Sequence, residues 1–369
     1  MKISIKSSDL AHYLKTVCRV PDRKSTDVFG HLLLEVDSSQ LRFSAHNGHK
    51  QMTLAIAPDL YSLVGEAFRI CVPAQKFDSV IGALPKDAAV SIQLAETKVV
   101  IASGRSRFTL ATLPAEQFPV MEFTADQSKG DLLIPGETLS ASIRQIGFCA
   151  ARSDCRSFLN GIFFEFRDGT MTLAASDGYR MGVIDVPVEG APMQHFILPS
   201  TCIEDVCQFV GSGPVLISTS GSMARFTRDG GVLHTKLIDG KYPDYRRLVD
   251  SAAKGDVARV TRDDLAGAIA RVTLLSEGTM PLVRMTITSD AISVQSVGGG
   301  VEDVANDVLP CDYHAEPLEI GFNGVFTNEI IRSLGDKECD LFFNSSGSGT
   351  LLRGRNSAST SFVLMPARL

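Results

Sequence analysis

Basic side chains recur on the amphipathic segments of this sequence, at spacings that suit contact with phosphate groups. Lys15 and Arg19 lie one helical turn apart, and Arg23 and Lys24 follow them closely. Later segments carry further bases, namely Arg144, Arg152, Arg156, Arg262, Arg271 and Arg332. Spaced cations of this kind can bind a nucleic-acid backbone without reading its bases. The same spacing also fits an ordinary solvated helix face, so the pattern leaves both interpretations open.

Motifs for catalysis are missing. The sequence contains no GxxxxGK[ST] phosphate loop, no GxSxG elbow and no HExxH zinc motif. The pair His46 and His49 on a turn is typical of a surface, and Ser345–Gly349 is more typical of a flexible turn than of a phosphate cradle. A hydrolase assembled from residues far apart in the sequence is the weakest of the functional hypotheses. We therefore expect no enzyme, no cofactor and no metal site.

The eight cysteines show no CxxC pairing, and most stand among apolar residues. They are Cys18, Cys71, Cys149, Cys155, Cys202, Cys207, Cys311 and Cys339. This usage indicates small core residues in a reducing compartment rather than a disulfide framework. The N-terminus lacks the apolar core of a signal peptide, and no apolar run is long enough for a membrane span. We expect a cytoplasmic protein without a membrane partner.

Composition indicates a globular protein of two or three domains. The chain has 369 residues, of which 44% are hydrophobic and 21% charged. Its net charge of −6 argues only weakly against nucleic acid, because an average cannot show whether the bases share one face.

A strand followed by an amphipathic helix occurs three times and is the element that must position the bases. The apolar stripes of these helices are Leu10, Leu14 and Val17, then Leu139, Ile143 and Ile146, then Leu265, Ile269 and Val272. Leu10, Leu139 and Leu265 stand 129 and 126 residues apart. Ser8 or Asp9 is the expected N-cap of the first helix. A constant period of this size predicts tandem copies of one structural unit.

A second helical module follows in the same frame, and alternating strands connect the two modules. Its copies begin at 68, 195 and 318, each as a strand that runs into a helix. Asn47–Gly48 and Asp168–Gly169 mark hairpin turns between the strands. A closing strand then ends each unit, with Leu113, Leu237 and Leu364 at matching places. The pattern predicts an α+β fold of three tandem two-helix domains with mostly antiparallel sheets, at 1–126, 127–253 and 254–369.

Four stretches carry a resemblance to a known family. SGRSRFTLATLPAEQFP, ASDGYRM, DGKYPDYRR and the terminal VLMPARL occur in collinear order along the whole chain. Together they resemble the bacterial sliding clamps, the beta subunits of DNA polymerase III. The resemblance implies a head-to-tail homodimer that closes a pseudo-sixfold ring around double-stranded DNA without sequence specificity. It also implies a processivity factor that tethers DNA polymerase III alpha, other polymerases, the clamp loader complex and mismatch-repair proteins.

The resemblance assigns residues to the dimer interface. Phe108 and Leu110 match an apolar contact of the first domain, and Leu274 and Leu275 match its partner in the third domain. The charged part of this interface is expected to comprise Lys76, Arg105 and Arg107 facing Glu302 and Asp303. Without the resemblance, Phe108 and Leu110 fit the core of their own domain equally well.

The resemblance also assigns a groove that binds short peptides from partner proteins, between the second and third domains. The matching positions are Leu159, Ser176, Gly178, Tyr179, Arg180, Met181, Pro243, Arg247, Met280, Asn323, Phe326, Ser348, Val363, Leu364, Met365, Pro366 and Arg368. Apolar walls, adaptable methionines and a few polar groups suit such a groove. A hairpin turn at ASDGYR and an edge strand at the tail are the purely structural alternatives.

For DNA, Arg23 matches a contact residue of the family, and Arg152 and Ser153 fall in a second contacting loop. Arg19 and Lys24 are added from their spacing. The segment 201–210 has no Lys or Arg, so the DNA-facing surface is expected to be less positive than is usual in the family. This motivates an alternative, a protein-interaction scaffold of the same fold with weakened DNA loading.

Overall fold

The computed structural model of the chain describes residues 1–37, 39–124, 126, 130–190, 192–276, 281–298 and 304–369. Its fold is α+β, and all strand pairs between its named strands are antiparallel. Contacts divide it into two compact units, Met1–Ala141 with Cys202–Leu237, and Ser142–Thr201 with Ile238–Leu369. The predicted boundaries at 1–126, 127–253 and 254–369 separate the three sequence repeats rather than these two units, and they remain a prediction. Among the described helices, none is long and apolar enough to cross a bilayer.

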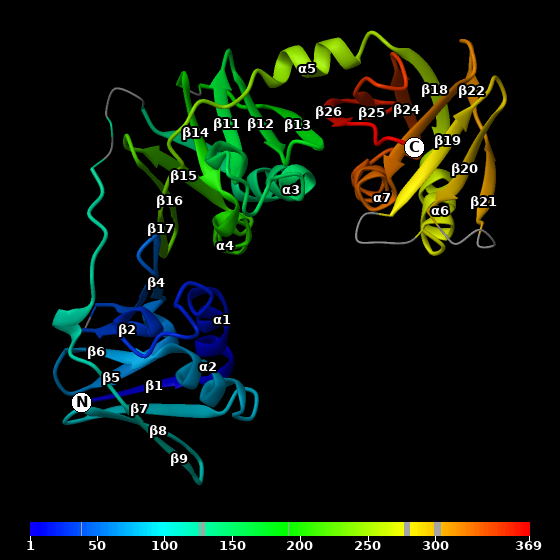
Figure 1. Cartoon of the computed structure of the whole chain (residues 1–369). Coiled ribbons are helices and arrows are strands. Elements are labelled where there is room, and N and C mark those ends of the chain that lie inside the picture. Colours follow the sequence, from blue (N-terminus) through cyan, green and yellow to red (C-terminus); the bar gives the residue numbers. More distant parts are fainter. Residues whose placement is uncertain (38, 125, 127–129, 191, 277–280, 299–303) are drawn as a thin grey trace. The chain divides into compact units, whose positions relative to one another are not determined.

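The first unit contains a five-stranded and an eight-stranded sheet, in the orders β5-β1-β7-β8-β9 and β10-β15-β16-β17-β4-β3-β2-β6 (Figure 1). Their strands are β1 (Lys2–Lys6), β2 (His31–Val36), β3 (Leu41–His46), β4 (Lys50–Ile56), β5 (Tyr61–Val64), β6 (Phe68–Pro73), β7 (Ala89–Ala95), β8 (Lys98–Ser103), β9 (Ser106–Ala111), β10 (Leu132–Pro135), β15 (Pro214–Thr219), β16 (Met223–Arg228) and β17 (Gly231–Lys236). The helices are α1 (Ser7–Val17), α2 (Ala74–Gly82) and α4 (Ile203–Val210). Helix α3 (Gly136–Gly147) passes from the first unit into the second.

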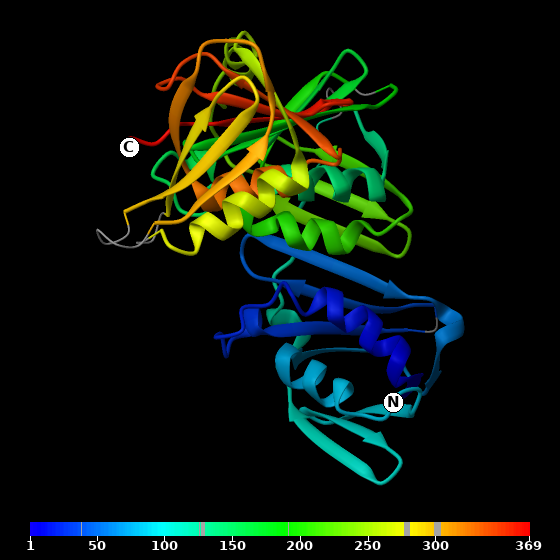
Figure 2. The same ribbon diagram turned by 90° about the vertical axis from the view of Figure 1, so that its right-hand side faces the viewer.

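The second unit contains a nine-stranded and a four-stranded sheet, in the orders β14-β11-β12-β13-β26-β25-β24-β18-β22 and β21-β20-β19-β23. Their strands are β11 (Gly161–Arg167), β12 (Thr170–Ser176), β13 (Arg180–Pro187), β14 (Gln194–Pro199), β18 (Asp256–Thr261), β19 (Leu282–Ile287), β20 (Ala291–Val297), β21 (Asn306–Pro310), β22 (Asp312–Tyr313), β23 (Leu318–Asn323), β24 (Glu338–Phe343), β25 (Thr350–Gly354) and β26 (Ser357–Leu364). The helices are α5 (Tyr245–Ala252), α6 (Arg262–Thr273) and α7 (Gly324–Ser333). Figure 2 shows the yellow α6 and the orange α7 side by side.

The predicted apolar stripes are confirmed. All nine side chains of the stripes on α1, α3 and α6 are at most 1% exposed. Helix α1 starts earlier than predicted: Lys6 is its N-cap without a side-chain bond, so Ser8 and Asp9 lie inside the first turn. Helix α5 was not predicted, because its eight residues carry too few apolar positions to show a period.

Both predicted hairpins are present. Asp168 and Gly169, with φ of 50° and 72°, form the two-residue turn between β11 and β12. Both residues have the positive φ that a type I′ turn requires. Gly48, with φ of 86°, lies in the three-residue turn between β3 and β4.

The closing segment of each repeat pairs with the strand that precedes the second helix. Leu113 exchanges backbone bonds of 3.0 Å with Cys71, Ile238 donates to Ile197 at 3.0 Å, and Ala367 donates to Gly321 at 2.8 Å. Cys71, Ile197 and Gly321 are each the fourth residue of their strand, β6, β14 and β23. The structurally equivalent residues are therefore Leu113, Ile238 and Ala367. The alignment on Leu237 and Leu364 was one and three residues out, because backbone pairing rather than leucine sets the register.

Two strand pairs join successive repeats. We call the pairing of β4 with β17 the first junction and that of β13 with β26 the second junction. Each junction lies within one compact unit. Counting along the paired strands from Cys71 and Ile197 makes Gln51 and His234 of the first junction equivalent to Met181 and Val363 of the second.

Six of the eight cysteines are buried, Cys311 is half-buried and Cys155 is exposed. None of the eight forms a disulfide in the described structure.

Candidate functional site

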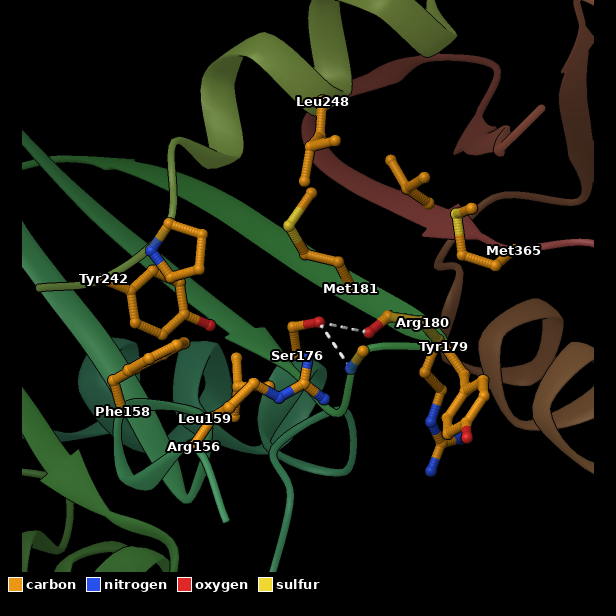
Figure 3. Close-up of a pocket in the computed structure, with 13 residues that line it drawn as sticks. Arg156, Phe158, Leu159, Ser176, Tyr179, Arg180, Met181, Tyr242, Leu248 and Met365 are labelled. Carbon is orange, nitrogen blue, oxygen red and sulfur yellow. Dashed lines mark hydrogen bonds between the residues drawn. The ribbon is translucent and has the colours of Figure 1, made fainter. Parts of the chain in front are cut away.

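An apolar cavity of about 230 Å³ opens at the second junction (Figure 3). Nine of the predicted groove residues line it: Leu159, Ser176, Gly178, Tyr179, Arg180, Met181, Pro243, Val363 and Met365. Four further lining residues were not predicted, namely Arg156, Phe158, Tyr242 and Leu248. The cavity thus draws on four separate parts of the second unit's chain.

The floor of the cavity is a cross-strand pair. Met181 on β13 lies opposite Val363 on β26, and the two are 5% and 6% exposed. Directly paired residues project from the same face of a sheet, so both side chains face the cavity. Leu364 follows Val363 and points to the opposite face, where it is buried. This alternation explains why the predicted Leu364 does not line the cavity.

One wall is the turn between β12 and β13. The Ser176 hydroxyl donates to the Arg180 carbonyl at 2.8 Å and accepts from the Gly178 amide at 3.1 Å. Gly178 has φ of 89°, and an added Cβ would lie 2.7 Å from Nη2 of Arg156. Only glycine therefore fits here without moving Arg156. Tyr179, 61% exposed, projects from this turn (Figure 3).

Arg156 forms part of the rim and is held by a two-point contact. Its Nε and Nη2 donate to the two carboxylate oxygens of Asp154, each at 2.9 Å. This bonding lowers the pKa of the Asp154 carboxyl and keeps it charged. The arginine rim is thereby fixed beside an apolar floor.

Arg180 lines the cavity, but its guanidinium group bonds to residues outside the lining. Its guanidinium donates to Asp177 at 3.0 Å, to the Phe148 carbonyl at 2.9 Å and to Glu329 on α7. The guanidinium carbon lies 4.2 Å from the ring centre of Phe326. The predicted Phe326 thus contacts Arg180 rather than lining the cavity.

The opposite wall comes from the segment before α5 and from α5 itself. Tyr242 stacks on Phe163 with ring centres 4.9 Å apart, and burial raises its pKa. The Tyr245 hydroxyl donates to Glu165 at 2.6 Å, and Arg246 forms an ion pair with the same carboxylate. These contacts fix α5 to β11, so that Leu248, 50% exposed, borders the cavity.

The other predicted groove residues of the described ranges lie outside the cavity lining. Arg247 is exposed on α5, and its amide is capped by Asp244. Asn323 accepts from Val325 and Phe326 amides at the start of α7. The Ser348 hydroxyl bonds that of Ser345, Pro366 and Arg368 line a separate cavity, and Met280 lies outside the described residues.

The predicted DNA-contacting residues fall into two groups. Arg23, Lys24, Arg152 and Ser153 are exposed, and within the described ranges the three basic ones form no ion pair. Arg19 instead pairs with Asp205 at 3.3 Å and approaches Glu204 at 3.9 Å, both on α4. The predicted lack of bases on this helix is thus accompanied by carboxylates that engage Arg19.

Arg107, Phe108 and Leu110 of the predicted interface lie on β9, an end strand of its sheet. Phe108 is half-buried and Leu110 is 9% exposed on β9, beside exposed Arg105 and Arg107. Lys76 is exposed on α2. Leu274 and Leu275, 81% and 44% exposed, follow α6. Glu302 and Asp303 lie outside the described residues.

Comparison with known proteins accounts for nearly the whole chain. Three family models match in order: DNA polymerase III beta subunit, N-terminal domain at 1–122, central domain at 133–244, and C-terminal domain at 252–368. Beta sliding clamps of Haemophilus influenzae and Escherichia coli are 28% and 27% identical, over the whole of both chains. Among solved structures, a griselimycin-bound sliding clamp of Pseudomonas aeruginosa superimposes with a TM-score of 0.93 at 27% identity, again over both full chains. The Caulobacter crescentus beta subunit gives 0.90 at 26% with the same coverage.

Proposed function

The chain belongs to the family of DNA polymerase III beta subunits, the bacterial beta sliding clamps, and we propose that its cavity at the second junction binds short peptides of partner proteins. Its function is that of a sliding clamp, a processivity factor of DNA replication that is not itself an enzyme. DNA and DNA polymerase III are its partners. The further partners in the proposal are other polymerases, the clamp loader complex and mismatch-repair proteins. Such partners meet it in the cytoplasm, a location that suits cysteines without disulfide bonds.

The observation that carries the peptide proposal is an apolar floor bordered by exposed apolar side chains. Tyr179, Leu248 and Met365 are 61%, 50% and 44% exposed around Met181 and Val363. Large apolar groups gathered in this way on a surface mark a binding site. The bonded turn at Ser176 supports a preformed shape, which lowers the entropic cost of binding.

The peptide proposal is tested with a synthetic peptide from a clamp-binding polymerase. Leu248→Glu places a charge at the cavity and should weaken binding about 10- to 100-fold in fluorescence polarisation. Asp250→Ala is the matched control on the same helix, because Asp250 is exposed and lies outside the cavity lining, and it should bind as wild type. A chain ending at Val363 should lose binding altogether. Equal binding by Leu248→Glu and wild type would place the site elsewhere.

The proposed homodimer follows from the repeat itself. Strand β4 pairs with β17, and β13 pairs with β26. The strand equivalent to β4 and β13 in the third repeat is β21, and the strand equivalent to β17 and β26 in the first repeat is β9. Within the described sheets, β9 and β21 are the longest end strands not bonded by a closing segment. Unpaired edges of this length invite another chain. Head-to-tail pairing of β21 with β9 of a second copy would repeat the two internal junctions.

The repeat also supplies the register of this contact. Asn306 is equivalent to Thr53 and Val183, and Arg107 is equivalent to their partners Val232 and Ser361. Arg107 should therefore lie opposite Asn306 of the partner. Oxidation of the double variant Arg107→Cys, Asn306→Cys should give a cross-linked dimer, and Arg105→Cys, Asn306→Cys should give far less. Light scattering should show two chains for wild type and one for Phe108→Asp, Leu274→Asp. A wild-type monomer at micromolar concentration would refute the dimer.

Encirclement of double-stranded DNA completes the proposal, with Arg23, Lys24, Arg152 and Ser153 as non-specific contacts. The loaded protein should stay on nicked circular DNA and slide off once the DNA is linearised. Equal loss from both would favour a protein-interaction scaffold of the same fold with weakened DNA loading. The observation in favour of that second candidate is Arg19, whose charge is engaged by Asp205 and Glu204.

A further inference from the structure

The first junction contains the same floor positions as the peptide groove, with different residues on them. Gln51 on β4 lies opposite His234 on β17, where the second junction has Met181 opposite Val363. Directly paired residues share one face of the sheet, so each pair forms a floor. Gln51 is 7% exposed, and its side chain has a donor and an acceptor to satisfy.

A segment of the chain itself lies over this floor. The Met121 amide donates to Oε1 of Gln51 at 2.7 Å. The Phe123 ring stacks on His234, with centres 5.5 Å apart and planes 27° apart. The guanidinium carbon of Arg225 lies 4.6 Å from the centre of the same Phe123 ring. One backbone donor and one aromatic ring therefore make these contacts.

The two repeats diverge directly after equivalent aromatic–proline pairs. Phe118–Pro119 in the first corresponds to Tyr242–Pro243 in the second, and both aromatic rings are buried. After Pro243, Asp244 caps helix α5, which contributes Leu248 to the wall of the cavity. After Pro119 the described residues up to β10 form no helix, and the chain continues over Gln51 and His234. The covered floor and the open floor thus differ in what the linker does.

We propose that the segment 120–124 is an internal ligand of a further peptide groove at the first junction, and that this first-junction groove accepts a separate extended peptide when the segment is displaced. The matching partner is an extended peptide with an aromatic side chain two residues after an apolar one, as in Met121-Glu122-Phe123. His234 and Arg225 receive the aromatic ring, and Gln51 receives the backbone amide. This inference rests on the proposed peptide groove of the second junction, since it assigns the same role to equivalent positions.

Displacement is feasible because the segment is only partly packed. Val120 is 65% exposed and Glu122 is exposed, while Met121 and Phe123 are half-buried. A segment with few buried contacts opens locally without global unfolding. Its tether to the chain nevertheless gives it a high effective concentration, on the order of millimolar for a short linker, which excludes weak external peptides.

The test uses a fluorescent peptide of residues 119–124, PVMEFT, and a protein with Leu248→Glu, which blocks the groove at the second junction. Phe123→Ala removes the ring of the internal ligand and should raise affinity for the probe at least about tenfold over the background protein. Val120→Ala is the matched control, because Val120 is exposed, and it should not change the affinity. Equal affinity in the Phe123→Ala and Val120→Ala variants would overturn the proposal.

Two additional variants locate the binding. Met121→Pro removes the amide donor by another route and should also raise affinity for the probe. Adding Gln51→Ala to Phe123→Ala should abolish the gain, and a gain that persists would overturn the proposal. Binding of the polymerase peptide to wild type is measured separately. If the polymerase peptide did not bind, only the groove at the second junction would be refuted, because the probe experiments do not use that groove.

Discussion

The two junctions are held by equivalent ion pairs, but they differ in what covers the floor. In each, the first residue of the inner strand bonds an acidic side chain on the second helix of the next repeat: Lys50 bonds Asp205, and Arg180 bonds Glu329. Side-chain exposure is 10% and 7% for the first pair but 9% and 48% for the second. At the first junction the floor is covered by the chain's own linker, and at the second the floor is open. One backbone arrangement thus gives either a seal or a binding groove.

The difference depends on a few side chains. A polar floor of Gln51 and His234 bonds the linker, whereas the apolar floor of Met181 and Val363 has no polar group with which to hold a backbone. The linker at the second junction instead forms helix α5, which contributes a wall of the cavity. The lesson is that a repeat protein can dedicate one of several equivalent positions to binding by changing the cover, not the scaffold.

The largest expected effect comes from the buried fastening of the first junction. Asp205→Ala leaves Lys50 buried without this carboxylate, and we expect a loss of about 3–5 kcal/mol in unfolding free energy. Urea denaturation followed by circular dichroism measures it.

Glu329→Ala is the matched change at the second junction. Arg180 keeps Asp177 and the Phe148 carbonyl, and half of Glu329 is solvated, so the expected loss is about 1 kcal/mol or less. Equal losses in the two variants would show that burial does not separate the junctions.

Converting the open floor to the polar type should weaken peptide binding. Met181→Gln places an amide where an apolar peptide side chain would cover it, at a cost of about 1–3 kcal/mol, or roughly 5- to 150-fold in affinity. Calorimetry with the polymerase peptide measures the change. The reciprocal Gln51→Met should leave that affinity unaltered, and a comparable loss there would remove the distinction between the two floors.

The turns before β4 and β13 offer a matched pair of glycines. Gly48 and Gly178 have φ of 86° and 89°, so alanine should cost each about 1–2 kcal/mol. A Cβ at Gly178 would meet Arg156 at 2.7 Å, whereas one at Gly48 has nothing within 4 Å. Gly178→Ala should therefore also lower peptide affinity by moving the rim, and Gly48→Ala should not. Unchanged affinity in Gly178→Ala would exclude Arg156 from the site.

The smallest expected effect is a pH dependence confined to the first junction. Burial lowers the pKa of His46, and Lys236 and His49 lower it further; burial and Arg225 lower the pKa of His234. Since the folded values lie below the unfolded ones, the unfolded chain binds more protons as the pH falls. The stabilisation is complete above the unfolded value of roughly 6.5 and is lost as the pH falls through the folded values.

Hydrogen exchange tests this prediction strand by strand. Protection of β4 and β17 should decrease between about pH 7.5 and pH 5.5 more than that of β13 and β26, where Ser176 and Val363 replace the histidines. His46→Ser should reduce the difference. A uniform decrease in all four strands would contradict the assignment.

The repeat and its helices could be predicted because their signals are local and periodic. Leu10, Leu139 and Leu265 mark three helices in one frame, and Asp168–Gly169 encodes its turn directly. The floor pair Met181–Val363 was reached through the family resemblance, since 182 positions separate its members in the sequence. No local pattern connects residues so far apart.

The remaining features depend on tertiary contacts that leave no local pattern. Asp205 on a predicted helix gives no sign of Lys50, which is 155 positions away. In the sequence Arg156 is one of several spaced bases, and only the fold places it beside Gly178. Tyr242 and Leu248 flank the recognised PDYRR motif, and the short helix α5 that orients Leu248 has too few residues to show a period.

The exposed thiol of Cys155 gives the groove at the second junction an intrinsic labelling position. It directly precedes Arg156 on the rim, while six of the other cysteines are buried and burial raises the pKa of the half-buried Cys311. Thiolates react faster than thiols, so an environment-sensitive maleimide dye should attach chiefly at Cys155. The labelled protein would report groove occupancy in real time without any engineered residue.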